Sequence, residues 1–306
     1  MKKIEYTIVS SDIYNSYLHK ANKLLKKIST STKKPILKIT SSDIIYYFES
    51  NYDILFIFFN SSTSNQEAKF KNLVQNYKYF PLKNELVQRI SGVTIPQNKK
   101  FVILINQNMP LSRIVFTILH ELSHLYFHNL EKNDKIFTSK FSGNYPKELI
   151  PYEDEANIIA SLLFCPTLKL ETLLTKGFSF NKIKSITNMS RKALHNRLLN
   201  YFYHIIDLSY KEALTLVLNY KDNNSQASLT IKKIINKKTS QKINRMSLSI
   251  KTSTGNIMDE ITCTSFLKQL SLNELIFELE YAHFTKNFLL EKLVINEYYN
   301  KQKTDG

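Results

Sequence analysis

The chain has 306 residues, 43% of them hydrophobic, so it is long enough for two domains with buried cores, and an intrinsically disordered chain is excluded. Lysine and arginine number 42 against 26 aspartates and glutamates, a net charge of +16 that favours an acidic or polyanionic partner without fixing the fold. Cys165 and Cys263 are far apart and form no CxxC motif, which excludes a disulfide framework and fits a reducing compartment.

No segment has the composition of an export signal or of a membrane span. Glu5 and Asp12 interrupt what would have to be the apolar core of a signal peptide. The most apolar runs, at residues 54–59 and 101–105, are far shorter than the roughly 20 residues that a membrane-spanning helix needs. We therefore expect a cytoplasmic protein with no membrane contact.

The spacing of apolar residues is mostly three and four, and the chain has only five glycines, so we expect a helix-rich α+β fold. The first helices are predicted at residues 11–28 and 41–50, with a weaker one at 65–76. Two β-rich runs, at 89–95 and 101–106, predict a hairpin with a five-residue loop and hence a small sheet.

The second half of the chain is predicted to be mainly helical. A helix at 111–129 is apolar nearly all round, and a second begins at Pro151 and ends before Pro166. Residues 178–201 predict two short helices around a turn, and the polar segment 221–226 predicts a linker. The remaining predicted elements are a basic helix at 228–238, a hairpin around Gly255, and helices at 272–283 and 286–300.

His120, Glu121 and His124 form an HExxH sequence within the apolar helix. Because four residues make slightly more than one helical turn, both imidazoles project from one face and can bind the same metal ion, while Glu121 lies one step round, within reach of a metal-bound water. Burying these polar side chains without a purpose would be costly. A catalytic zinc usually takes three protein ligands, so we expect a third one, first of all a carboxylate, elsewhere in the chain.

The helix that begins at Pro151 supplies the candidate ligand. If Glu153 faces the metal, Asn157 lies one turn on along the same face, where its side-chain oxygen can hold the outer nitrogen of a histidine ligand. Glu155 would point roughly 160 to 200° away, so we prefer Glu153 as the ligand. The alternative is that Glu153 is a surface acid in the first turn of a helix, where the helix dipole favours it.

The stretches from Phe116 to His124 and from Glu153 to Pro166 resemble the ImmA/IrrE family of zinc-dependent metallopeptidases, whose members share an HExxH helix followed by an E-x-E-A-N/D helix. The resemblance covers roughly residues 41–201. It implies a zincin-like peptidase domain with a gluzincin-like arrangement of ligands.

The resemblance also implies a role for each motif residue. His120, His124 and Glu153 would hold one Zn²⁺, with Mn²⁺ as the alternative ion, Glu121 would be the general base of peptide hydrolysis, and Asn157 would support a ligand from behind. Characterised relatives cleave or inactivate a helix-turn-helix repressor encoded nearby, in mobile elements, phages or a DNA-damage response. The expected partner is therefore a protein substrate of that kind, and the expected activity is that of an anti-repressor protease.

We predict three parts of the chain. Residues 1–170 form a zincin-like metallopeptidase domain, residues 171–220 a helix-turn-helix-like helical segment packed on it, and residues 221–306 a separate C-terminal α+β domain without a recognisable motif. An extended substrate is expected to add to an exposed edge of the hairpin at 89–106, because strand addition supplies backbone pairing without demanding a sequence.

The helix-turn-helix-like segment supports an alternative function, that of a DNA-binding transcriptional regulator with a vestigial or structural metal site. Arg191, Lys192 and Arg197 would face outward from the second helix as contacts for DNA or for substrate. The same helices can instead simply close the peptidase domain, which leaves nucleic acid as a secondary partner. A further basic patch, for which a solvated helix face is the simpler explanation, consists of Lys232, Lys233, Lys237, Lys238, Lys242 and Arg245.

Three more residues lie near the motifs. His128 shares a helix face with His124, and we expect it to support a ligand or to end the helix rather than to be a fourth ligand. Tyr145 and Tyr152 precede the third-ligand region and are candidate oxyanion donors, although ordinary packing is the simpler role in a chain with 18 tyrosines.

Overall fold

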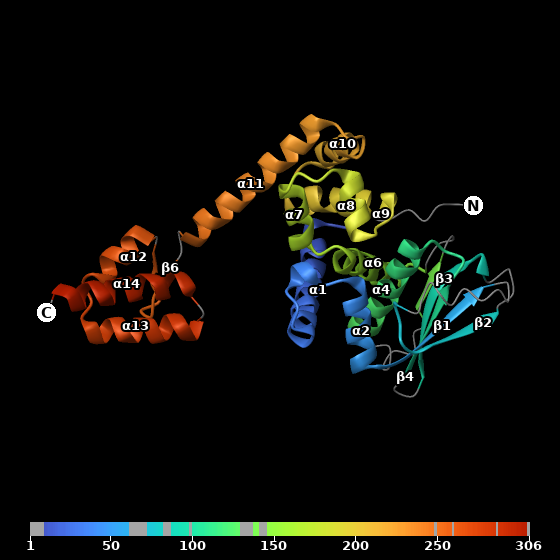
Figure 1. The fold of residues 1–306 in the computed structure, drawn as a ribbon, viewed down its shortest axis with the longest axis horizontal. Helices are drawn as coiled ribbons and strands as arrows, with labels where there is room; N and C mark the ends of the chain where they lie inside the picture. The colour runs from blue at the N-terminus through green and yellow to red at the C-terminus, as the bar shows by residue number, and fades with distance from the viewer. Residues whose placement is uncertain are drawn as a thin grey trace. The chain divides into compact units, whose positions relative to one another are not determined.

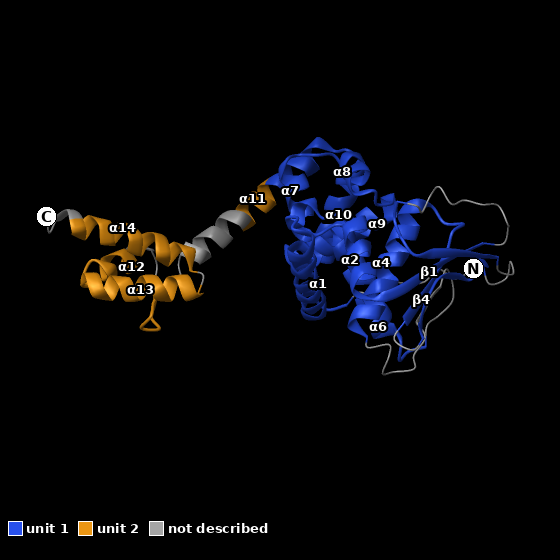
Figure 2. Ribbon diagram, turned by 60° about the horizontal axis from the view of Figure 1, so that its bottom comes forward, with its two compact units in different colours: residues 1–232 blue, residues 233–306 orange. Residues whose placement is uncertain are grey.

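The computed structural model describes residues 9–60, 72–81, 87–97, 100–128, 137–140, 146–247, 250–258, 260–285 and 287–304. The helix predicted at 65–76 lies mostly outside these residues, and its last five positions form turns and bends. The chain divides into two compact units, residues 1–232 and 233–306, which are described separately (Figure 2).

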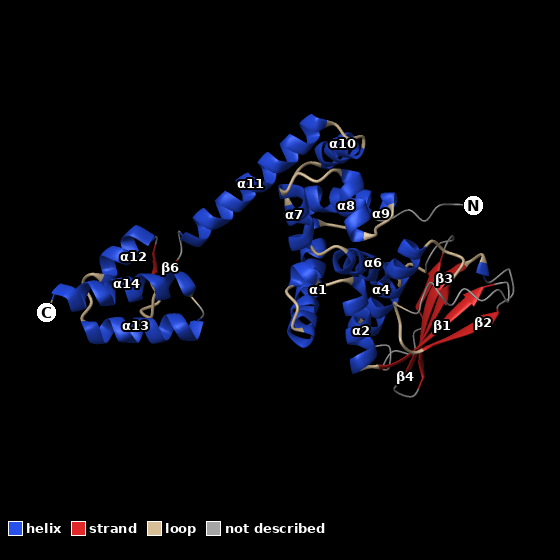
Figure 3. Ribbon diagram, in the orientation of Figure 1, coloured by secondary structure: helices blue, strands red, loops and turns tan. Residues whose placement is uncertain are grey.

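The first unit combines many helices with one mixed sheet, so its fold class is α+β and helix-rich, as predicted (Figures 1 and 3). Its described helices are α1 (Ser11–Thr32), α2 (Ser41–Asn51), α4 (Leu111–Phe127), α6 (Ile150–Phe164), α7 (Thr167–Thr175), α8 (Phe180–Thr187), α9 (Arg191–Asn200) and α10 (Tyr210–Lys221), together with the 3-10 helix η1 (Ile36–Lys38) and the π-helix η3 (Tyr201–Ile205). The described strands are β1 (Asp53–Asn60), β2 (Tyr77–Pro81), β3 (Ile90–Gln97), β4 (Lys100–Asn106) and β5 (Phe137–Lys140).

The sheet has the order β2-β1-β4-β3-β5. Strand β1 runs parallel to both β2 and β4, and β3 is antiparallel to β4 and β5. Side chains alternate along β1 and β4, so Phe56 and its partner Ile103 are fully buried while Leu55 and its partner Val102 are only half-buried. Helices α2 and α4 contact the sheet, α6 packs on α4, and α1 packs on α6, which places the core between the sheet and these helices.

The loop that we expected in the hairpin was wrong, and the exposed edge of the hairpin is shorter than expected. Gln97 pairs with Lys100, and Pro96 lies within β3 opposite Phe101, so the strands extend further than predicted and the five-residue loop does not exist. The edge of the hairpin is also largely covered, because β1 pairs with β4 along its whole length and β5 pairs with β3 from Ile90 to Thr94. Among the described residues, only positions 95–97 of β3 have no strand partner on that side, so the strand addition that we expected for the substrate is limited to this short stretch.

Apart from the one at 65–76, the helices predicted in the first unit are confirmed, with ends that local capping explains. Thr40 and Asp43 form a reciprocal capping box at the start of α2. The two short helices of the helix-turn-helix-like segment are separated by Asn188 in a left-handed conformation (φ 55°), and the Ser190 side chain accepts a hydrogen bond from the Ala193 backbone at the start of α9. In the first unit, helices α7 and α10 and strands β1, β2 and β5 were not predicted.

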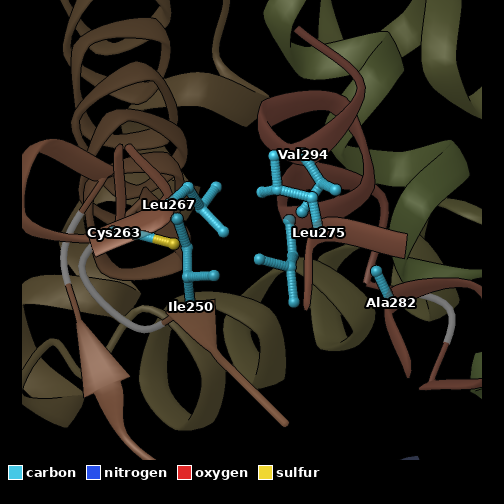
Figure 4. Packing of buried hydrophobic residues seen from close by; sticks show 7 residues of the cluster. Ile250, Cys263, Leu267, Leu275, Ala282 and Val294 are labelled. Atoms are coloured by element: carbon cyan, nitrogen blue, oxygen red, sulfur yellow. The ribbon is translucent and has the colours of Figure 1, made fainter. Parts of the chain in front are cut away.

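The second unit has a hydrophobic core of its own. The hairpin around Gly255 is confirmed as β6 (Ile250–Lys251) and β7 (Ile257–Met258), and the helices are α12 (Glu260–Leu267), α13 (Leu272–Thr285) and α14 (Phe288–Thr304). Buried side chains from these elements, among them Ile250, Cys263 and Leu275, pack together (Figure 4). The units part within α11 (Ser225–Ser247), a continuous helix that begins inside the predicted linker, and our three-part division of the chain stays a prediction.

Among the described residues, no single helix is long and apolar enough to cross a membrane. Helices α6 and α7 together have the necessary length and composition, but they are bent by 47° at the break between them.

Candidate metal centre

Helices α4 and α6 pack against each other and bring the three predicted ligands together inside the first unit. His120 and His124 project from α4 and Glu153 from the first turn of α6, where Pro151 starts the helix. The three side chains are 3%, 0% and 2% exposed, so Glu153 is not the surface acid of the alternative reading. The sequence prediction placed all three on facing helices, and the structure agrees with that placement.

The spacing of the three groups fits a tetrahedral ion. The Nε2 atoms of His120 and His124 lie 3.0 Å apart. Glu153 has Oε2 at 3.3 Å from His120 Nε2 and Oε1 at 3.6 Å from His124 Nε2. Zinc binds nitrogen and oxygen at about 2.0–2.2 Å, and a tetrahedron with bonds of that length has edges of about 3.3–3.6 Å between neighbouring ligand atoms. The cluster therefore has close to the dimensions of one face of such a site.

The buried polar atoms also need a partner of this kind. Apart from the two imidazoles, neither oxygen of Glu153 has a hydrogen-bond partner among the described residues. Burial acts to lower the pKa of His120, but the adjacent Glu153 carboxylate outweighs it and raises that pKa, whereas burial and the neighbouring imidazoles lower the pKa of His124 well below its ordinary value. A divalent cation would satisfy the imidazoles and the carboxylate at once.

Glu121 is held from the sheet side of α4. Its Oε2 atom accepts a hydrogen bond of 2.7 Å from Thr94 Oγ1 on β3, and its side chain is fully buried. Gly92 on the same strand permits this approach, because a Cβ atom at that position would lie 2.6 Å from Thr117 Cγ2 and 2.8 Å from Glu121 Oε1. The strand thus fixes the orientation of the carboxylate that the sequence marked as the base.

A chain of polar contacts supports His124 from behind. Its Nδ1 atom lies 2.8 Å from His128 Nδ1, and His128 Nε2 lies 3.7 Å from Glu155 Oε2. Glu155 in turn accepts a hydrogen bond of 2.6 Å from Lys20 Nζ on α1. Burial acts to raise the pKa of Glu155, but the contacts with His128 and Lys20 outweigh it and lower that pKa. Glu155 points away from the metal ligands, as expected, and it contacts His128, whose own Nδ1 atom lies against the outer nitrogen of His124.

Residues 79–199 match the family model described as the IrrE N-terminal-like domain, a family of peptidases. This segment is an IrrE N-terminal-like domain. The match contains both motif helices and confirms the resemblance to the ImmA/IrrE family. No curated protein matches the chain. A peptidase-family domain with a His/His/Glu cluster fits a metallopeptidase of the IrrE kind with a metal cofactor, and the fold is consistent with a zincin-like domain.

Asn157 lies beside the ligands of the IrrE-like domain, at the position that sequence spacing gave it. Its side chain interacts with His120 and helps to raise the pKa of that imidazole. This effect is smaller than the rise caused by Glu153 and smaller than the opposing effect of burial, which lowers the pKa. The Phe116 ring also lies near His120, with ring centroids 6.5 Å apart. Tyr152 packs against His128 at 5.1 Å between centroids, and Tyr145 lies outside the described residues.

The prediction that Arg197 faces outward was wrong. Its side chain is fully buried; Nε donates to the Cys165 carbonyl at 3.1 Å and Nη2 to Thr167 Oγ1 at 2.8 Å, so it ties α9 to the corner between α6 and α7. Arg191 is exposed and lies 3.8 Å from an Asp222 oxygen. Lys192 is exposed as well, and it also lines a cavity of the first unit. Of the three basic residues, Arg191 and Lys192 are therefore exposed as predicted, and Arg197 is not.

Two residues that support the metal centre were not identified from the sequence. Thr94 lies on a strand and Lys20 on a distant helix, and neither forms a motif with the ligands in sequence. One signal was available for the strand contact: Gly92 is one of only five glycines and lies inside a predicted strand, a pattern typical of close backbone approach.

Proposed function

We propose that the chain is a zinc-dependent endopeptidase. The observation that carries this proposal is the convergence of His120, His124 and Glu153 inside an IrrE-like domain. Their ligand atoms lie 3.0–3.6 Å apart, close to the separations between neighbouring ligand atoms around a tetrahedral zinc ion. Zinc is preferred because two imidazoles and one carboxylate are ligands typical of its catalytic sites, and manganese is the alternative ion.

Each residue of the site has a role in the proposed reaction. A bound divalent cation supplies a Lewis acid that polarises the scissile carbonyl and acidifies a water molecule. Glu121 takes the proton of the attacking water and passes it to the leaving amine, while Thr94 holds its Oε2 atom in place. Asn157 and His128 keep the imidazoles of His120 and His124 in orientation.

The proposed substrate is a helix-turn-helix transcriptional repressor. Support comes from the family resemblance, whose characterised members act on repressors of that kind. The chain would then be an anti-repressor protease of a mobile element, a phage or a stress response, working in the cytoplasm, with nucleic acid as a secondary partner.

The rival function, a DNA-binding regulator with a vestigial or structural metal site, has less support. One of its three proposed contacts, Arg197, is buried, which leaves Arg191 and Lys192 as the exposed pair. The carboxylate beside the ligands is held in a fixed orientation by Thr94, an arrangement that a purely structural metal site does not need.

The substitution Glu121→Gln tests the proposed function. We expect the variant to keep about one zinc per chain, measured by atomic emission, because no ligand changes. Cleavage of a repressor encoded beside this gene should slow by at least about 100-fold, since general acid–base catalysis contributes about 10²–10⁴. Glu148→Gln, at an exposed position of the same unit, is the matched control and should cleave normally. Cleavage by the Glu121→Gln variant at the normal rate would contradict the mechanism.

A further inference from the structure

A cavity of about 320 Å³ lies in the first unit between α4, α6, α9 and the π-helix η3. On α4 it is lined by Ser112 and Phe116, which precede His120 by eight and four residues and so share its helix face. Because four residues rise about 6 Å along a helix, Phe116 lies one turn from the metal ligands. The cavity and the ligands thus occupy consecutive turns of one face.

The same holds for α6. Asn157 and Ser161 line the cavity, and they follow Glu153 by four and eight residues on its face. Asn157 interacts with His120 while it lines the cavity, and the Phe116 ring does the same from α4. The cavity therefore directly adjoins the buried ligands, with Asn157 and Phe116 shared between the two.

The chemistry of the opposite wall favours a bulky uncharged group. Leu199, Tyr203 and Tyr210 add aliphatic and aromatic surface to that of Phe116. The charged residues of the lining carry both signs, Arg113 and Lys192 against Asp154, so no single charge is demanded of the occupant. The volume is at the lower end of the roughly 300–1,000 Å³ of small-ligand sites, a size that suits one large side chain rather than a folded segment.

We propose that this cavity is a specificity pocket, which takes a large aromatic or aliphatic side chain of the substrate next to the scissile bond. The proposal rests on the proposed function, because it needs a metal at the neighbouring ligands. It assigns the face of α9 that carries Ala193 and Asn196 to substrate recognition. Burial of such a side chain would anchor an otherwise extended substrate beside the metal centre.

Two hydroxamates with the same metal-binding group distinguish binding in the pocket from binding to the metal. Acetohydroxamate probes the metal alone, and 3-phenylpropanohydroxamate adds a phenyl ring on a short arm. Isothermal titration calorimetry with the zinc-loaded full chain should show the phenyl compound binding at least about tenfold more tightly, because its aromatic ring is removed from water in the pocket. In the variant Ala193→Phe, the new ring fills the pocket. The ratio of the two dissociation constants, acetohydroxamate to 3-phenylpropanohydroxamate, should then fall to near one, while acetohydroxamate binds as before.

Ser185→Phe is the matched control, because it adds the same ring at an exposed position of α8 outside the cavity, and its ratio should equal that of the unmodified chain. Asn196→Phe fills the cavity from the next turn of α9 and replaces Ala193→Phe if that variant does not fold. A ratio near one in the unmodified chain, or a ratio unchanged by a folded pocket-filling variant, would overturn the pocket. Failure of both compounds to bind would instead contradict the metal site of the proposed function, on which the pocket depends.

Discussion

Helices α4 and α9 both carry polar side chains that sequence reasoning marked as functional, but the fold uses them differently. On α4, His120, Glu121 and His124 are buried among polar groups from α6 and β3 that complete a site. On α9, Arg197 is equally buried, yet its partners are the Cys165 carbonyl at the end of α6 and the Thr167 hydroxyl at the start of α7. The two imidazoles on α4 point their Nε2 atoms at each other and at Glu153, whereas Arg197 donates two hydrogen bonds to groups that hold the fold together.

The difference lies in what each pattern specifies. The HExxH spacing fixes two nitrogen atoms on one helix face, a geometry that holds wherever the helix packs. A basic residue on a helix specifies only a charge, and its long side chain can turn toward the nearest carbonyl once a neighbouring element covers it. Substitutions on the α4 and α6 side should therefore affect metal binding, and substitution of Arg197 should affect folding.

The largest expected effect is at Glu153. Glu153→Gln should lower zinc affinity by more than about 100-fold, beyond the 10–100-fold typical of groups that only support a ligand. The metal-free variant should be at least as stable as the unmodified metal-free protein, because it no longer buries a carboxylate with few partners. Competition with a chromophoric chelator gives the affinity, and Glu148→Gln is the exposed control. Unchanged zinc affinity would remove Glu153 from the site.

The next largest effect is expected for Arg197→Leu, a substitution that should change stability rather than metal binding. Loss of the two donors leaves the Cys165 carbonyl and Thr167 without their partner, and we expect the free energy of unfolding to fall by about 2–3 kcal/mol. Zinc affinity of the folded variant should not change. Urea denaturation measures the difference, and Arg191→Leu at an exposed position should stay within about 0.5 kcal/mol. A variant with lost metal binding and normal stability would reverse the comparison.

Glu155→Gln should have an intermediate effect on the metal side. The variant keeps the shape of the side chain but removes the charge that joins His128 to Lys20. We expect zinc affinity to fall by about 10–100-fold, the range of groups that orient a ligand from behind. Asp154→Asn, the neighbouring acid on α6, is the control. If zinc affinity is the same in both variants, the series of polar contacts from His124 to Lys20 does not affect how strongly His124 binds the metal.

The smallest effect is expected at Asp43 in the N-terminal cap of α2. This position lies outside α4 and α9 and shows how much one surface cap contributes to the free energy of unfolding. Burial acts to raise the pKa of Asp43, but hydrogen bonds from Lys34 and Thr40 outweigh it and lower that pKa. Its stabilisation is therefore complete above the unfolded pKa of about 4 and is lost as the pH falls through the lower folded pKa. Asp43→Asn should cost about 0.5–1 kcal/mol at pH 7, and urea denaturation near pH 2 should show no difference from the unmodified chain. A pH-independent difference would argue against the charge.

The sequence predicted those parts of the fold that depend on interactions between residues close together in the chain. The helices at α1, α2, α4 and α6 follow from apolar spacing and caps, and the facing positions of His124 and Glu153 follow from helical geometry. Strand β1 was missed because a short continuous apolar run does not reveal its period. Thr94 and Lys20 were missed because their contacts join elements far apart in the chain, and Arg197 was misplaced because nothing in α9 itself shows that it is covered.

The central place of β1 in the sheet has a practical consequence. The family match begins at residue 79, but β1 ends at Asn60 and lies between β2 and β4. A shortened gene product that starts at the match would lack β1, leave the backbone of β4 as an open edge prone to aggregation, and lose Lys20 as well. The segment that matches the family model is thus shorter than the segment whose strands and helices complete the sheet and support the ligands.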